Sequence, residues 1–588
     1  MKAKKALTLL LTVAMVSGAV LTGCGNGDNS DPGNTGSVNS SNTDSDNTGS
    51  AGGEGSEASG GSGNTGADAT PFYKTLDPEI TGEIDVMCWS GDSTYHQDIG
   101  HQDWAPADIT SQNVAIVYAV AKAFNEMYPN IKINLYAKAD DPNGNDTPWQ
   151  QELENFRAEH GKYPDVYTPN DTVGDVSRGM VADLSVYADD PLYQSFNQSL
   201  MKLMNYHGMQ AGIPQFQQPW GVYVNRELAE TNNIDIPDPD WNIEEYTDFI
   251  TSANNSDVWG TIGDMTRFIG TGTNTIIAQM ANYSGSGDHV DLTSEEVTSL
   301  LDYIPRWAES EIWTLNNQGA MDSAIMDAGG WWGYTFFTNN LVLAYEGDPW
   351  MMNVASLSQN DDGSWPWGAV QSHDWDIYPR PSTDYKGNTV GVVIDPMAVH
   401  NFAMDDGDPA WSDSEKANLD LAYAFSSFWC GSTEAFEARV NQNYYNNGTE
   451  ISCLNDSLPL VTGEAFDEQM KLWYSTDVHA RYGDAELMPG FQEVLRLWEA
   501  GELWDVSDKT YPYYVTEAGE QVTCLYEWLN ATSADVTGGV SVTDPGWVDT
   551  VKANLADWNT KINARFEQAE SGLREGLKNY YGFTDADF

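Results

Sequence analysis

The chain has 588 residues, enough for three or four domains of average size or for two large lobes. Its 27 basic and 88 acidic residues give a formal net charge of −61, and this field repels the phosphates of nucleic acids and anionic lipid headgroups. Hydrophobic residues make up 40% of the chain and aromatic residues 12%, too many for a disordered acidic polymer. The composition therefore excludes a nucleic-acid partner and indicates a folded body with an acidic surface.

The amino-terminal segment has the pattern of an export signal. Three lysines lie within residues 1–5, an apolar run over residues 6–20 is short for a membrane span, and Leu-Thr-Gly-Cys follows at 21–24. This segment resembles a bacterial lipoprotein signal. The resemblance implies that residues 1–23 are removed and that Cys24 is lipidated and held at the outer face of the cytoplasmic membrane, on the cell exterior. The alternatives are an ordinary secretory peptide or a short membrane helix with a chance cysteine.

Residues 25–70 consist almost entirely of Gly, Ser, Asn, Thr and Asp, a composition typical of a flexible linker. A coil of this length reaches about 35 to 40 Å. We therefore expect residues 24–70 to form a flexible, lipid-anchored linker and residues 71–588 to form the folded body.

The start of the body alternates between strand and helix patterns. The predicted elements are a strand over 84–89, a helix over 114–128, a strand over 131–137, a helix over 149–160 and a strand over 164–168. Such alternation is typical of an α/β lobe with a largely parallel sheet, in which ligands bind at the carboxyl ends of the strands.

Seven phrases in this order resemble the sugar-binding extracellular solute-binding proteins of ABC importers, the maltose-binding-protein-like family 1. They are the first strand ending in Trp89, AKAFNEMYPNIKI, GKYPDVYTPND, GMVADLSVYADD, GMQAGIPQFQQPWGVYVNRELAE, LVLAYEGDPWM and ANLDLAYAFSSFWC. The resemblance implies a two-lobed α/β fold of the periplasmic-binding-protein type (type II), which traps a ligand between its lobes by hinge closure. It further implies a monomeric, non-enzymatic receptor that delivers a neutral carbohydrate to a membrane permease.

Carried onto this chain, the resemblance implies boundaries for the lobes. Lobe 1 would comprise about 71–212 and 376–430, and lobe 2 about 213–375, with a first crossing at 213–225. Residues 431–588 match the family only loosely and would form a helical carboxyl-terminal extension.

Sugars present C–H faces that stack on aromatic rings and hydroxyls that pair with planar polar side chains. Several such residues stand where the cleft of the family would be, and many aromatic plates would suit an oligosaccharide. For Trp89 and for the clustered Trp331, Trp332 and Trp375, the alternative is that the ring packs inside the protein. Gln218 stands where relatives often carry an acidic residue, so the sequence does not identify the sugar. The candidate ligand-binding residues are Trp89, Asp92, Asn170, Asp171, Gln217, Gln218, Trp220, Trp331, Trp332, Trp350 and Trp375.

Other tryptophans are predicted to belong to the core, because they stand at helical spacing from Leu, Phe or Val. These are Trp429, Trp498, Trp528 and Trp558. Cys88 reads as part of a buried strand, so any disulfide is expected among Cys430, Cys453 and Cys524.

Motifs for zinc, redox or nucleotide chemistry are missing from the sequence, and no cofactor is predicted. Oxygen ligands at Asp141, Asn143, Asn145 and Glu152 have calcium-loop spacing, but Asp146 stands where a glycine would turn the chain, which favours a solvated turn. Two rival functions stay open. A secreted glycoside hydrolase would need a pair of carboxylates at the groove, and a receptor for peptides or other solutes would keep the fold.

Overall fold

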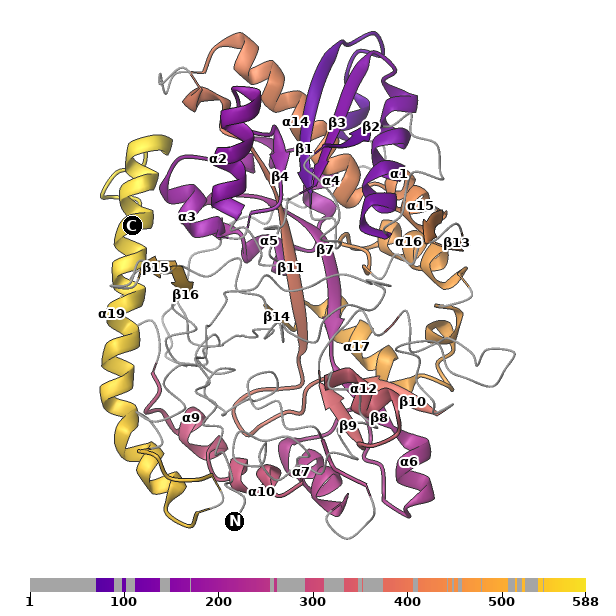
Figure 1. The fold of residues 1–588 in the computed structure, drawn as a ribbon, viewed down its shortest axis with the longest axis vertical. Coiled ribbons are helices and arrows are strands. Elements are labelled where there is room, and N and C mark those ends of the chain that lie inside the picture. The colour runs from indigo at the N-terminus through magenta and orange to yellow at the C-terminus, as the bar shows by residue number, and fades with distance from the viewer. Residues whose placement is uncertain are drawn as a thin grey trace, which may run out of the picture.

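The computed structural model describes the following parts of the chain: 70–88, 98–101, 112–137, 149–169, 171–253, 258–261, 291–310, 333–346, 352, 374–405, 411–441, 443–446, 449–452, 457–476, 479–505, 513–515, 521–523, 538–542 and 544–588. These residues form two lobes joined by long strands, with a long helix beside both lobes (Figure 1).

Lobe 1 is built on a mixed sheet that has seven strands within the described residues. Its order is β14-β11-β4-β1-β3-β2, with β7 paired to β11. β1 pairs in parallel with both β3 and β4, as the alternation of strands and helices predicts. The strands are β1 (Gly82–Cys88), β2 (Asp98–His101), β3 (Ile131–Ala137), β4 (Val166–Tyr167), β7 (Ile213–Trp220), β11 (Val390–Val399) and β14 (Leu503–Asp505).

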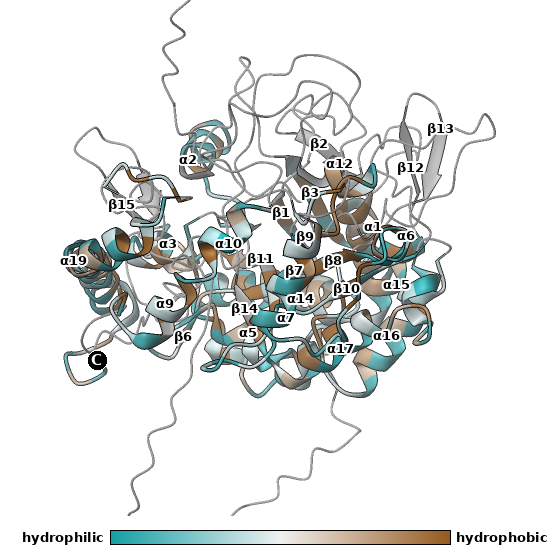
Figure 2. Ribbon diagram, turned by 90° about the horizontal axis from the view of Figure 1, so that it is seen from below, coloured by the Kyte–Doolittle hydropathy of each residue, from teal (hydrophilic) through white to brown (hydrophobic). Residues whose placement is uncertain are grey.

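Both faces of this sheet are buried because its strands alternate apolar side chains between the two sides. Ile84 and Val86 pack into a core with α1 (Gln112–Met127), α14 (Asp413–Gly431) and α15 (Thr433–Asn441). Met87, on the opposite side, packs with α2 (Trp149–His160) and α3 (Thr172–Ser177). Figure 2 shows hydrophobic residues gathered on the interior strands and hydrophilic residues on the outer faces of α2 and α19.

Strands β7 and β11 leave lobe 1 as an antiparallel pair and run toward lobe 2 (Figure 1). Prolines at 214, 219 and 396 lie in this pair and remove ladder donors, and the register shifts between Asp395 and Pro396. The first of the two strands, β7, lies within residues 213–225, the segment for which the resemblance implies a crossing.

Lobe 2 contains a three-stranded antiparallel sheet in the described part of the chain, with the order β10-β8-β9. Its strands are β8 (Val222–Asn225), β9 (Ala344–Glu346) and β10 (Trp375–Tyr378), and its helices are α6 (Arg226–Thr231), α7 (Ile243–Ser252), α9 (Glu295–Leu300), α10 (Ile304–Ala308) and α12 (Gly333–Thr338). The expected return to lobe 1 at residue 376 is corrected: β10 pairs with β8 inside lobe 2, and the chain returns along β11.

Short elements complete the two lobes. They are η1 (Phe72–Lys74), η3 (Leu184–Tyr187), α4 (Pro191–Ser195), α5 (Gln198–Lys202), β5 (Asn205–Tyr206), β6 (Met209–Gln210), η5 (Phe402–Met404), β12 (Asn443–Asn446), β13 (Thr449–Ser452), α16 (Glu464–Tyr474), η6 (Ala480–Gly483), α17 (Pro489–Ala500), β15 (Tyr513–Val515) and β16 (Gln521–Thr523).

The carboxyl-terminal region is part of both lobes and is not an appended set of helices. β14 joins the large sheet beside β11, and α17 packs against β10 of lobe 2. The last helix, α19 (Trp547–Tyr581), is 35 residues long and about 52 Å in length at 1.5 Å per residue. The core assignment of Trp429, Trp498 and Trp558 is confirmed, since each is at most 6% exposed; Trp528 lies outside the described residues.

Local signals explain where several helices begin and end. Ser412 and Glu415 form a reciprocal capping box at the start of α14, and Asn242 and Glu245 form one at the start of α7. Gly501 ends α17 in the left-handed conformation, at a φ of 75°.

Cys430 is a buried free thiol on α14, and burial raises its pKa. Of the remaining body cysteines, Cys453 and Cys524 lie outside the described residues. No helix among the described residues is both long and apolar enough to cross a membrane.

An aromatic cluster holds α16, η6 and α17 together. The His479 ring lies 3.9 Å from the Trp473 ring, centroid to centroid and nearly parallel to it, and Tyr482 and Phe491 pack beside them. His479 is 1% exposed, and burial lowers its pKa to about 3. The imidazole is therefore neutral wherever the protein is folded near neutral pH.

His479 should make the protein sensitive to acid. At pH 5 the unfolded state binds a proton on this imidazole and the folded state does not, so the free energy of unfolding falls as the pH drops below about 6.5. The loss in the free energy of unfolding at pH 5 is about 2 kcal/mol.

Denaturant melts of wild type and of His479→Gln at pH 7 and pH 5 measure this loss. The variant should lack the part of the pH dependence that comes from His479. His160→Gln, at an exposed histidine of α2, is the control and should keep it. Identical slopes in all three proteins would contradict the assignment.

Candidate functional site

The candidate site is the edge where the carboxyl ends of β1, β3 and β4 meet the crossing strand β7. Parallel strands present their ends at one edge of a sheet, where ligands of open α/β folds bind. Among the described residues, Thr168 follows β4 directly and its hydroxyl donates to Oε1 of Gln215 on β7, at 2.7 Å. This hydrogen bond connects the end of the lobe 1 sheet to the strand that leads into lobe 2.

Asp171, a candidate ligand-binding residue, follows β4 by four residues and caps α3. Its Oδ1 accepts the N–H of Gly174 at 2.7 Å, and the residue is 6% exposed. On α3 itself, the carboxylate of Asp175 accepts the hydroxyl of Tyr167 at Oδ2, at 3.1 Å, and pairs with Arg178. Burial raises the pKa of Asp175, and Arg178 opposes that shift. Asp171 therefore sits on a short helix that buried polar contacts hold in place.

The glutamines and the tryptophan predicted on the first crossing lie on β7. Gln218 pairs with Val393 and Gln217 with Ile394 of β11, while their side chains lie outside the described part of the structure. Trp220 ends β7 and is 1% exposed, so its ring is packed inside the protein. Its contact with a ligand stays a prediction.

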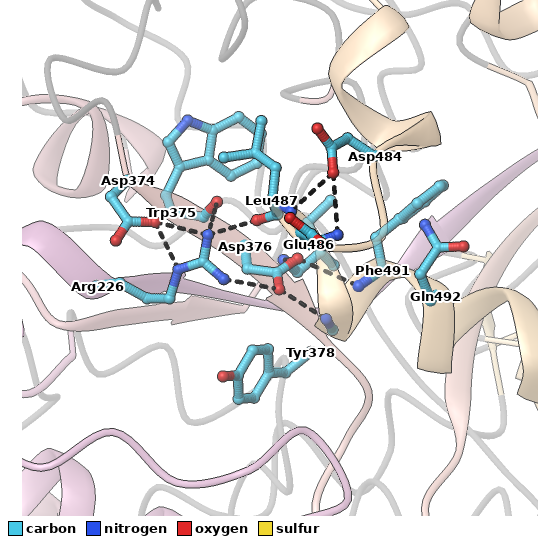
Figure 3. A network of polar contacts seen from close by, with 12 residues as sticks. Arg226, Asp374, Trp375, Asp376, Tyr378, Asp484, Glu486, Leu487, Phe491 and Gln492 are labelled. Atoms are coloured by element: carbon cyan, nitrogen blue, oxygen red, sulfur yellow. Dashed lines mark hydrogen bonds and ion pairs between the residues drawn. The ribbon is translucent and has the colours of Figure 1, made fainter.

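Trp375 lies in the core of the molecule and has no exposed surface. The guanidinium of Arg481 lies 4.1 Å from the centroid of its ring, and Arg481 Nη2 donates to the Trp375 carbonyl at 3.2 Å. Figure 3 shows the indole beside the polar network described next. Trp375 is thus packed in the core, like Trp220, and its contact with a ligand stays a prediction.

The remaining candidate residues lie outside the described residues, and their roles stay predictions. They are Trp89, Asp92, Asn170, Trp331, Trp332 and Trp350, together with the lipidation site Cys24 and the calcium-loop positions Asp141, Asn143 and Asn145. Glu152, the last position of that loop, is buried on α2 and accepts from Asn155 at 3.3 Å. The described residues contain no cluster of His, Cys, Asp or Glu that could hold a metal ion.

A buried carboxylate attaches the carboxyl-terminal region to lobe 2 (Figure 3). Asp376 accepts the backbone N–H groups of Gly490 at 2.6 Å and Phe491 at 3.1 Å, at the start of α17, and Arg226 contacts it at 3.2 Å. Burial is the largest influence and raises the pKa of Asp376 to about 6, although these donors favour the charged form. Asp376 thus caps a helix from another part of the chain, and this network is structural.

A second buried ion pair was not anticipated from the sequence. Arg380, after β10, pairs with Glu346 at the end of β9, and the two side chains are 2% and 5% exposed. Burial lowers the pKa of Arg380 to about 10. Both residues lie at the end of the lobe 2 sheet that faces the crossing, because Glu346 pairs with Val222, which is two residues after the end of β7. The phrase EGDPW, chosen from the sequence for Trp350, contains Glu346, but its partner is more than thirty residues away and only folding brings the pair together.

A pocket of about 250 Å³ opens at the opposite edge of the lobe 1 sheet. Lys162 lies in it and bridges Asp85 at 2.9 Å and Asp165 at 3.0 Å. Glu83 is the second residue of β1 and Asp165 precedes β4, so this pocket lies at the amino ends of the parallel strands, away from the candidate site. Lys162 is shared by these two carboxylates, and burial raises the pKa of Asp165.

Comparison of the sequence found no matching family model and no matching curated protein. Comparison of the structure shows the fold. A sugar transporter from Rhizobium etli in an open conformation aligns with a TM-score of 0.50 at 14% identity, over 81% of this chain and 99% of that one.

Two further solved structures align at lower scores. Maltose-bound MalE3 of T. maritima has a TM-score of 0.46 at 13% identity, over 81% and 100% of the chains. The ABC substrate-binding protein Lmo0181 of Listeria monocytogenes in complex with cycloalternan has a TM-score of 0.45 at 15% identity, over 86% and 100%. The alignment with the Rhizobium etli protein shows that the chain shares the two-lobed fold of that sugar transporter, the fold that the resemblance of its sequence implies.

Paired variants of Asp171 separate the contribution of its helix cap from that of its charge. Asp171→Ala removes the cap of α3 and should lower the free energy of unfolding by about 1 kcal/mol, whereas Asn caps about as well as Asp and should keep it. Denaturant melts of both variants give the values. Equal destabilisation by Ala and Asn would show that the charge, and not the cap, is what matters to the fold.

Proposed function

We propose that this protein is an extracellular solute-binding protein that captures a neutral carbohydrate, an oligosaccharide in particular, and delivers it to the permease of an ABC transporter. The observation that carries the proposal is the fold shared with the Rhizobium etli sugar transporter over nearly the whole of that protein. The three aligned proteins are a sugar transporter, a protein with bound maltose and a substrate-binding protein in complex with cycloalternan.

The site supports a binding role in physical terms. It joins the strand ends of lobe 1 to a crossing strand, so a ligand touching both lobes would favour the arrangement in which they are close. Asp171 and the glutamines of β7 supply planar polar groups of the kind that pair with sugar hydroxyls. The net charge of −61 favours a neutral ligand over an anionic one.

We further propose that Cys24 carries the lipid anchor and that residues 25–70 tether the body at the outer face of the cytoplasmic membrane. This proposal rests on the signal-like pattern of residues 1–24 and on the composition of the linker.

The ligand proposal predicts selective stabilisation by glycans. At 100 times its Kd, a ligand that binds only the folded state adds about 2.7 kcal/mol to the free energy of unfolding. A thermal-shift screen of mono- and oligosaccharides should show a shift that grows with chain length within one glycan family, with the glycan recovered intact. Shortened glycan would identify a glycoside hydrolase instead, and a response to peptides alone would keep the fold and change the ligand. Equal binding of a monosaccharide and its oligomers would contradict the oligosaccharide proposal.

The anchor predicts a change in location on a single substitution. Cys24→Ser removes the thiol that would take the lipid, so the protein should move from the membrane fraction of a bacterial host to the soluble fraction and lose fatty-acid label. Cys524→Ser is the matched control and should stay with the membrane. Fatty-acid label that persists on the Cys24 variant would contradict lipidation at this site.

A further inference from the structure

The carboxyl-terminal helix α19 belongs to the cores of both lobes. One stripe of side chains runs along it at helical spacing. Trp547, Val551, Leu555, Trp558 and Phe566 are buried in the core that includes Val222, Trp241 and Leu301 of lobe 2. Leu573 and Leu577, further along the same helix, are buried in the core that includes Met87 and Tyr167 of lobe 1. A single continuous element therefore completes both lobes.

Polar contacts reinforce the lobe 2 end of α19. Asn559 accepts the backbone N–H of Leu292 at 3.0 Å, and Lys552 lies 3.3 Å from the carboxylate of Asp302. The lysine pair is exposed and contributes little. The buried tryptophans supply most of the attachment, since a large aromatic side chain buries the most apolar surface.

The lobe 1 end is attached by close backbone packing. A Cβ at Gly576 would lie 2.5 Å from Cα of Ser177 on α3, so only glycine allows this approach. Tyr581 donates its hydroxyl to the carbonyl of Val181 at 2.7 Å. Glu570 contacts Nε2 of His207 at 2.7 Å, and both side chains are 6% exposed. The helix on which α19 rests, α3, is the one that Asp171 caps.

In both views α19 stands apart from β7 and β11, on one side of the molecule (Figures 1 and 2). Rotation of one lobe about the crossing strands displaces points in proportion to their distance from that axis. An α-helix keeps its length, because its backbone hydrogen bonds set the rise per residue. A helix attached to both lobes at a distance from the hinge therefore opposes their rotation.

The geometry points to a strut: α19 holds lobe 1 and lobe 2 at a narrow range of angles, and wide opening requires its last turns to leave α3. This restraint acts in the free protein. If the protein takes up a ligand as proposed above, the release of α19 from lobe 1 limits how fast the ligand is exchanged. This consequence rests on the proposed function.

The stretch between the two attachments offers a direct test. Glu567 and Gln568 are exposed and lie between Phe566, buried in lobe 2, and Glu570, buried against lobe 1. The double substitution Glu567→Gly and Gln568→Gly makes the helix flexible there and removes no buried side chain. The matched control is Ala556→Gly with Asp557→Gly, an exposed pair inside the part attached to lobe 2.

The measurement is the distance between spin labels on the full chain without ligand, placed at the exposed positions Glu159 of α2 and Glu295 of α9 through an encoded keto amino acid. Wild type and the control pair should give one narrow distribution, and the 567/568 pair a broader one. A broad distribution in wild type, or no difference between the two glycine pairs, would overturn the strut. Because no ligand is involved, this outcome is independent of whether the protein binds sugar.

A second pair of variants tests the lobe 1 attachment. Gly576→Ala should push α19 from α3 and broaden the same distribution. Gly572→Ala, four residues earlier and facing open space, should leave the distribution unchanged. Equal distributions in these two variants would contradict the role of the α3 contact.

Discussion

The antiparallel pair of β7 and β11 is the connection on which the rest of the structure depends. It runs from Met397 opposite Ile213 to Gly391 opposite Trp220, so the same two strands belong to the lobe 1 sheet and lead into lobe 2. β11 also pairs with β4 at one end and with β14 at the other. The position of the candidate site, between the strand ends of lobe 1 and the first residues of lobe 2, follows from this pairing.

The carboxyl-terminal third changes how such a pair of lobes can behave. Asp376 joins α17 to lobe 2 through buried hydrogen bonds at the start of that helix. α19 completes the cores of both lobes on the other side of the molecule. Connections on two sides of the crossing restrict the rotation of one lobe relative to the other.

Lobe 2 buries a pair of opposite charges. Glu346 and Arg380 form an ion pair that is almost wholly buried at the crossing end of the lobe 2 sheet. Removing one partner of such a pair leaves an uncompensated charge in the interior, whereas the intact pair adds little net stability. In the sequence, Glu346 begins the phrase EGDPW that leads to Trp350.

Much of lobe 1 could be predicted from local pattern alone. The strand over 131–137 and the helix over 149–160 match β3 and α2 residue for residue, because their apolar residues repeat at the period of each element. The buried positions of Trp429, Trp498 and Trp558 follow from the same periodicity. Other features of the fold were decided only by the tertiary structure, because they depend on contacts between segments that are distant in the sequence. The pairing of β10 with β8, the burial of Trp375 under Arg481 and the attachment of α19 to both lobes have no local signal, since a period tells which face of an element is apolar and not which partner covers it.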